Sequence, residues 1–384
     1  MKKILLVSTI PLSLKVFSLG LSFMEFLRDK GYDVHAAGGG GREAECIRER
    51  GFPYHEIFIP RQIRPLSDLK AFVSLARILK KERFDVVHTQ TSKAGFIGRL
   101  AARMAGVPVV VHTAHNWPFH QLLPFYLRYF YLMLERLAGH WCDALIVDTR
   151  AVKQYGMQCR VIPEEKIHQV YMGIDCARFN EYTREKKLEV RRSLGIGPEK
   201  IVIGAISRLV PDKGIETFID CARRLKDRDD LFFVVGGDGE LREQCERDVE
   251  ASGLRRKFTF LGHLDDVVPY LNAFDVFFLP TLREGFGVIF AEAQACGVPV
   301  VASDIGPLRE AVDDGETGLL VPPGDTRGFV DALLRVCEPQ ERARMSLQAR
   351  QYVRNNFAVS DIHEKTRRLY QTLWDAREKR LEKR

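Results

Sequence analysis

Residues 276–293 read VFFLPTLREGFGVIFAEA and contain the junction from which the fold is most readily predicted. The apolar run 276–279 has the length of a buried strand, and an alanine-rich run that opens a helix follows a loop with two glycines. Gly285 and Gly287 allow a tight backbone turn, and the N–H groups at the start of the helix can receive an anion. A strand that leads through such a loop into a helix is the repeating unit of a parallel α/β sheet.

The same alternation of apolar runs and helical-period stretches recurs along most of the chain. Amphipathic stretches lie at 69–81 and 95–105, and a polar stretch at 180–200 is interpreted as a linker. Strands are expected at 4–8, 32–36, 86–89, 107–112, 144–147, 201–206, 231–235, 259–261, 276–279, 298–302 and 318–321. The fold class is therefore α/β, with two Rossmann-like, doubly wound domains at 1–180 and 181–360 and a C-terminal segment at 361–384. The cleft between two such domains is the default site for a ligand.

Composition narrows the class of protein further. The chain has 384 residues, too many for one core, and its eight cysteines form no CxxC pair. No stretch reaches the roughly 18 uncharged apolar residues of a spanning helix. We expect reduced thiols and a cytoplasmic protein, with peripheral attachment to the inner face of the membrane as an open alternative.

The charge is concentrated in the first half. The net charge is +7, and residues 1–180 contain 25 Lys and Arg against 16 Asp and Glu, a net charge of +9. A positive face suits an anionic partner such as a phospholipid surface or a lipid diphosphate, although ordinary solvated surface charge is an equal alternative. A nucleic-acid partner would leave the second half of the chain unexplained, so none is expected.

A second motif, SRLVPDKG at 207–214, also follows a predicted strand. Pro211 and Gly214 mark a turn that keeps Arg208 and Lys213 at the strand end. Two fixed cations at such a place can bind a diphosphate. Either residue alone would be interpreted as a surface charge, but their placement together favours the binding role.

These motifs together resemble a known family. With VGGDG at 235–239, FLG at 260–262 and ASDIGP at 302–307, they match the retaining GT-B glycosyltransferases grouped as family 4, most densely over 201–325. The resemblance implies two domains that face a central cleft and a C-terminal helix that returns to the first domain. It also implies sugar transfer from a nucleotide diphosphate with no metal and no cofactor.

The resemblance assigns roles to particular residues. Glu284 would lie against the transferred sugar, Glu292 would bind the ribose hydroxyls, and Gly262 with His263 would face the base. The catalytic residues implied are His115, Glu284, Arg208 and Lys213. The donor-binding residues implied are Arg208, Lys213, Gly262, His263, Glu284, Gly285, Phe286, Gly287, Val288 and Glu292.

The resemblance also assigns the acceptor to the first half of the chain. His115, in VHTAHNWPF at 111–119, matches the family histidine that contacts the donor sugar, although Asn116 replaces the glycine that usually follows it. The loop at 10–15 lacks the paired glycines of many relatives, and subfamilies that build bacterial surface polysaccharides resemble this version. Their acceptors are commonly lipid-linked sugars, so Lys15 and Lys93 become candidates to bind an acceptor phosphate.

The stretch 122–141, rich in Leu, Phe, Tyr and Met, allows two interpretations. It can lie in a membrane interface, or it can be an ordinary core-facing stripe, which is the commoner outcome.

The expected function is a retaining hexosyltransferase. Its donor would be a UDP-linked hexose or N-acetylhexosamine, its acceptor a lipid-linked or free saccharide, and its pathway cell-surface glycan biosynthesis. The alternatives are a GT-B epimerase or phosphorylase and a non-catalytic nucleotide-sugar-binding protein. A dinucleotide-dependent oxidoreductase is excluded because the glycines at 38–41 follow the second strand and not the first.

Overall fold

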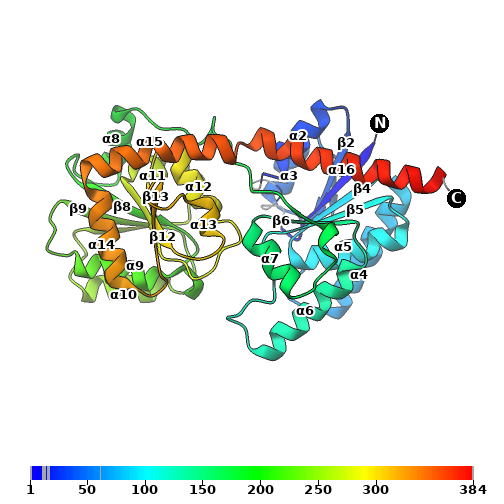
Figure 1. Ribbon diagram of the computed structural model, residues 1–384, viewed down its shortest axis with the longest axis horizontal. Helices are drawn as coiled ribbons and strands as arrows, with labels where there is room; N and C mark the ends of the chain where they lie inside the picture. Colours follow the sequence, from blue (N-terminus) through cyan, green and yellow to red (C-terminus); the bar gives the residue numbers. More distant parts are fainter. Residues whose placement is uncertain (1, 11–13, 15–17, 61, 383–384) are drawn as a thin grey trace. The chain divides into compact units, whose positions relative to one another are not determined.

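Two parallel β-sheets organise the chain, one in each of two units (Figure 1). The computed structural model describes residues 2–10, 14, 18–60 and 62–382. The first unit comprises residues 1–173 and 359–384, and the second comprises residues 174–358. Lys15 lies outside the described residues.

The sheet of the first unit has seven parallel strands in the order β3-β2-β1-β4-β5-β6-β7. The strands are β1 Lys3–Val7, β2 Asp33–Gly38, β3 Tyr54–Glu56, β4 Val86–Gln90, β5 Val109–Ala114, β6 Ala144–Val147 and β7 Ile167–Gln169. The two edge strands, β3 and β7, have three residues each and were not expected.

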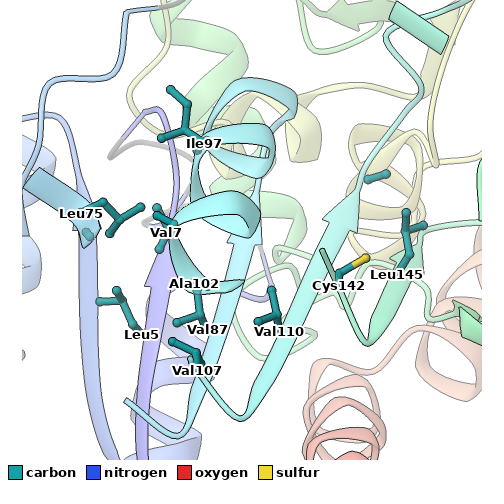
Figure 2. Packing of buried hydrophobic residues seen from close by; sticks show 14 of the residues in the cluster. Leu5, Val7, Leu75, Val87, Ile97, Ala102, Val107, Val110, Cys142 and Leu145 are labelled. Atoms are coloured by element: carbon teal, nitrogen blue, oxygen red, sulfur yellow. The ribbon is translucent and has the colours of Figure 1, made fainter. Parts of the chain in front are cut away.

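Helices cover both faces of this sheet. They are α2 Leu21–Asp29, α3 Arg42–Glu49, α4 Pro65–Glu82, α5 Ser92–Ala105, α6 Phe125–Gly139, α7 Arg150–Gln158 and α16 Val359–Glu382. Leu5 and Val7 point to the face covered by α4 and α5, where Leu75 and Ile97 pack (Figure 2). The alternate residues of β1 point to the other face, against α2 and α16. Because both faces are buried, the strands are apolar runs without alternation, as the sequence shows.

The sheet of the second unit has six parallel strands in the order β10-β9-β8-β11-β12-β13. The strands are β8 Ile201–Ile206, β9 Leu231–Gly236, β10 Phe258–Gly262, β11 Val276–Leu279, β12 Val300–Ser303 and β13 Gly318–Val321. The helices are α8 Arg184–Ser193, α9 Ile215–Arg224, α10 Arg242–Ala251, α11 Val268–Ala273, α12 Val288–Ala295, α13 Leu308–Ala311, α14 Thr326–Cys337 and α15 Pro339–Asn356. All six strands of this sheet lie where the sequence predicted them, within two residues.

The predicted linker at 180–200 is wrong, because this segment contains α8. Only Arg191 of this charged helix is buried. Its guanidinium donates to the carbonyl of Ala273 at 2.8 Å and to the carboxylate of Asp275 at 2.7 Å. A helix anchored by a polar side chain shows little apolar periodicity, so the pattern was missed.

The core interpretation of 122–141 is wrong for most of α6. Only Glu135, Ala138 and Gly139 of its 15 residues are buried, whereas α5, with 14 residues, buries seven. Within the described part of the chain, no helix is both long enough and apolar enough to cross a bilayer.

The strand orders place a switch point in each sheet. In the first unit the chain leaves β1 toward β2 on one side, while β4 lies on the other side of β1. In the second unit β8 and β11 are related in the same way. Helices diverge at such a point and leave an opening beyond the carboxyl ends of the two strands, where ligands bind in sheets of this type.

Candidate functional site

Lys213 and Glu284 meet at the switch point of the second sheet. Lys213 ends the short 3-10 helix 211–213 after β8, and Glu284 lies in the loop after β11. The Lys213 Nζ atom donates to Glu284 Oε1 at 2.6 Å, and both side chains are only 14% exposed. Two residues that the sequence analysis singled out 71 positions apart therefore form one ion pair.

The two loops that carry this pair are fastened to each other. Thr281 Oγ1 donates to the carbonyl of Asp212 at 3.0 Å, and the N–H of Leu282 donates to the same carbonyl at 2.8 Å. Gly214 has φ +70°, and a Cβ atom there would lie 2.0 Å from the carbonyl oxygen of Pro280. Only glycine allows this approach. Thr281 was missed by the sequence analysis, because a lone threonine in a loop gives no signal of its partner.

Arg208 is exposed directly after β8. Its neighbour Leu209 is buried, and the N–H of Leu209 donates to the carbonyl of Asp238 at 2.9 Å. A Cβ atom at Gly237, whose φ is +117°, would lie 1.8 Å from the carbonyl oxygen of Ser207. The loop after β9 thus supports the loop that presents Arg208.

The first turn of α12 begins beside Glu284. Gly287 is the N-cap residue with φ +83°, and Val288 is the first helical residue. Phe286 is buried, and its ring packs against Phe357 with centroids 4.9 Å apart. The anchored ring fixes the position at which the helix begins. A helix N-terminus carries partial positive charge and favours an anion.

Glu292 lies further along α12 and is half-buried. Burial raises the pKa of Glu292 to about 7, the charge of Arg178 opposes the rise, and Asp266 adds to it. Arg178 and Asp266 are themselves paired at 3.0 Å. Glu292 therefore changes charge near neutral pH, which ordinary surface carboxylates do not do.

Gly262 and His263 follow β10 and are not part of the ion pair. Gly262 ends the strand with φ +72°, and its carbonyl accepts from the N–H of Gly237 at 2.7 Å. His263 is exposed, and its Nε2 lies 3.8 Å from Asp265. The structure therefore leaves the imidazole at the surface of the second unit.

In the first unit, His115 follows β5 and lies beside Asp148, which follows β6. His115 Nδ1 is 3.0 Å from Asp148 Oδ2, and the carboxylate is buried. A carboxylate that accepts from Nδ1 fixes the orientation of the ring. Asp148 was not predicted from the sequence, although its position directly after a predicted strand was an available signal.

The residues around His115 are held by structural contacts. Asn116 Oδ1 accepts from the N–H of Trp117 at 2.8 Å, which holds this turn. Trp117 is buried, and its Nε1 donates to the carbonyl of Val152 at 2.8 Å. Trp117 therefore belongs to the core, and its role is to anchor the segment that presents His115.

Lys93 lies in the first turn of α5, near the switch point of the first sheet. Its Nζ is 2.7 Å from Asp68 Oδ1 and also donates to the carbonyl of Gln62. Thr9 and Thr91 join the ends of β1 and β4 through their hydroxyl groups at 2.8 Å. The ammonium of Lys93 is thus partly neutralised by Asp68.

Family models match both units. The model described as Glycosyltransferase Family 4 matches residues 21–178, and that described as Glycosyl transferases group 1 matches residues 186–352. An Escherichia coli protein, UDP-Gal:alpha-D-GlcNAc-diphosphoundecaprenol alpha-1,3-galactosyltransferase, is 32% identical over 320 residues, which is 82% of either chain. The chain belongs to the family 4 glycosyltransferases.

Two further proteins resemble this glycosyltransferase. The Staphylococcus aureus capsular polysaccharide biosynthesis glycosyltransferase CapM is 27% identical over 91% of this chain and 92% of its own. The crystal structure of Anabaena HepE in complex with UDP and glucose matches with a TM-score of 0.84 at 22% identity, over 97% of this chain and 100% of its own. This likeness confirms the expected GT-B fold.

Proposed function

We propose that this glycosyltransferase transfers a hexose or N-acetylhexosamine from a UDP-sugar to a lipid-linked acceptor, with retention of anomeric configuration, in cell-surface glycan biosynthesis. The observation that carries the proposal is the ion pair of Lys213 with Glu284 beside the first turn of α12. A nucleotide diphosphate needs cations, and a sugar ring needs a hydrogen-bond acceptor. This site holds one of each, 2.6 Å apart.

Lys213 can bind Glu284 and the diphosphate at the same time. An ammonium has three N–H donors, so one can stay on Glu284 while the others bind phosphate oxygens. Arg208 adds a second cation, and the start of α12 adds partial positive charge. As the glycosidic bond breaks, negative charge grows on the departing diphosphate, and these groups stabilise it without rearrangement. In this proposal they do so without a metal ion.

The rest of the donor would extend along α12 and β10. Glu292 would accept hydrogen bonds from the ribose hydroxyls, and the backbone at Gly262 and His263 would face the base. The loop Gly285–Gly287 and Val288 would supply backbone N–H donors to the diphosphate.

The acceptor would be bound by the first unit. The pair of His115 and Asp148 lies at the carboxyl end of adjacent strands β5 and β6, the edge at which doubly wound sheets bind ligands. The name of the Escherichia coli relative specifies a diphosphoundecaprenol acceptor and UDP-galactose. That relation, at 32% identity, supports a lipid-linked acceptor here, with Lys93 and Lys15 as candidates for its phosphates.

A donor panel in chelator tests this function. We expect a UDP-sugar to raise the melting temperature more than GDP- or ADP-sugars, since a ligand at 100 times its Kd stabilises the native state by about 2.7 kcal/mol. Transfer to undecaprenyl-diphosphate-linked GlcNAc should proceed in EDTA, and NMR of the product should show the donor's anomeric configuration. Binding of no nucleotide sugar would refute the proposal, and loss of transfer in EDTA would refute metal independence.

Donor affinity should depend on pH through Glu292. Its pKa of about 7 means that it is mostly ionised at pH 8 and mostly protonated at pH 6. Ribose hydroxyls donate to the ionised form, so we expect the Kd for a UDP-sugar to rise about tenfold from pH 8 to pH 6. The diphosphate of a UDP-sugar does not titrate in this range. Calorimetry at both pH values measures the effect.

Glu292→Gln is the control for this pH dependence. Its affinity should be weaker than that of the wild type at pH 8 and nearly independent of pH. The raised pKa also means that, between about pH 4.5 and pH 7, the folded state keeps a proton on Glu292 that the unfolded state has released. Stability from this group is therefore lost as pH rises to about 7, and Glu292→Gln should melt higher than the wild type at pH 8. A pH dependence equal to that of the wild type would remove Glu292 from the donor site.

A further inference from the structure

The outer face of α6 is apolar and exposed. Phe125, Tyr126, Tyr129, Phe130, Met133 and Leu137, which we call the α6 apolar face, are all exposed, and Phe125 is 84% exposed. Their spacing of three and four residues puts them on one side of the helix. The opposite side packs on the core through Tyr131, Leu132 and Ala138. A contiguous aromatic face of this kind on a folded unit marks an interaction surface.

The large exposed apolar residues gather in one part of the chain. Within the described residues, 12 of 14 such residues lie between positions 58 and 137, all in the first unit. The other two, Leu282 and Leu347, lie in the second unit. Ordinary surface composition would spread them over both units, so their concentration around α6 and its neighbours requires a specific cause.

The segment of the chain that contains this face is positively charged. Residues 58–140 contain 12 Lys and Arg against 4 Asp and Glu, a net charge of +8. α5 contacts both α4 and α6. Five basic residues on α4 and α5 are exposed, namely Lys70, Arg77, Lys80, Lys81 and Arg103.

The acidic residues of these helices do not offset that charge at the surface. None of the three carboxylates on α4, α5 and α6 is exposed. Each is paired with a cation: Asp68 with Lys93 at 2.7 Å, Glu82 with Lys3 at 2.6 Å, and Glu135 with Arg99 at 2.8 Å. These three helices thus expose aromatic, aliphatic and cationic side chains but no carboxylate.

We infer that the α6 apolar face docks on an anionic lipid bilayer. Aromatic residues at the boundary between headgroups and acyl chains, together with exposed cations on the same unit, are the chemistry of a surface that binds an anionic membrane. A second copy of this chain fits less well, since two surfaces with this charge would repel each other. The inference goes beyond the proposed function and stands without it, because it concerns where the protein resides and not what it transfers.

Vesicle sedimentation with the full chain tests this inference. We expect binding to phosphatidylcholine vesicles with about 30 mol% phosphatidylglycerol and much weaker binding to phosphatidylcholine alone. The double variant Phe125→Ser/Tyr129→Ser should lose at least about tenfold in partition coefficient. Salt at about 0.5 M should weaken binding by the wild type, because the attraction to anionic headgroups is screened.

Leu347→Ser is the matched control. Leu347 is 57% exposed on α15 of the second unit, and its loss should leave vesicle binding unchanged. The circular dichroism spectrum and the melting temperature without ligand should be nearly the same in all three proteins, which shows that the double variant is folded. Equal partition of double variant and wild type, or no sedimentation with either vesicle, would overturn the inference. So would a dimer in ultracentrifugation that the double variant abolishes, since the face would then join two copies.

Discussion

Lys213→Ala is expected to lower the turnover number by about two to three powers of ten, which corresponds to roughly 3 to 4 kcal/mol of transition-state stabilisation. The Lys213 ammonium lies 2.6 Å from Glu284, at the switch point where the diphosphate would bind. Arg208→Ala should have an effect of the same kind. Single-turnover transfer from a UDP-sugar measures the loss, and circular dichroism checks that the fold is kept.

Two controls distinguish the loss of the Lys213 ammonium at the site from a general change in charge and from the unpairing of Glu284. Lys226→Ala removes an equal charge from an exposed position. Lys226 precedes β9, at the amino ends of the strands and away from the loops that carry the site, so turnover should be unchanged. Lys213→Ala also leaves the Glu284 carboxylate without its ammonium. If the unpaired carboxylate of Glu284 caused the loss of turnover, then Lys213→Ala/Glu284→Gln would recover most of the activity. We expect no recovery, and recovery would show that Lys213 acts only by pairing with Glu284.

The positions of most strands in both sheets could be predicted from the sequence. Strands at 144–147, 201–206, 276–279 and 318–321 agree with the structure to the residue. A strand buried on both faces must be a short apolar run between turn residues, so its signal is local. The edge strands β3 and β7 are half-covered and three residues long, and they gave no such signal.

The site could be predicted only where glycine and charge stand in one short motif. Lys213 and Glu284, which form an ion pair, come from two such motifs, and the roles of Arg208 and Glu292 stay predictions. Asp148 and Thr281 were not predicted, because each acts through a partner that is distant in sequence or through a backbone carbonyl. Which face of α6 is exposed could not be predicted from the sequence either. Its aromatic composition is compatible with a core, the commoner outcome, and with an exposed face, and only the fold determines which face is covered.

Gly214→Ala is expected to disrupt the site more strongly than Gly253→Ala, a substitution of nearly equal backbone strain. Gly214 has φ +70°, and Gly253 has φ +72° with no atom within 4 Å of the place where a Cβ atom would lie. Alanine therefore costs about 1–2 kcal/mol of strain at either position. At Gly214 the added methyl group would also lie 2.0 Å from the Pro280 carbonyl oxygen. The loops after β8 and β11 must then separate, and the hydrogen bonds from Thr281 and Leu282 to Asp212 are lost with that separation.

The comparison of Gly214→Ala with Gly253→Ala therefore isolates the close approach of the two loops. We expect Gly214→Ala to lower the free energy of unfolding by at least about 2 kcal/mol more than Gly253→Ala does, since the contacts between the loops are lost in addition to the strain. At a temperature where both variants are folded, Gly253→Ala should keep near-normal transfer, and Gly214→Ala should lose both donor binding and transfer. Urea unfolding and calorimetry with a UDP-sugar measure the two effects. Equal donor affinity in the two variants would mean that the contact between these loops does not hold Lys213 and Glu284 in place.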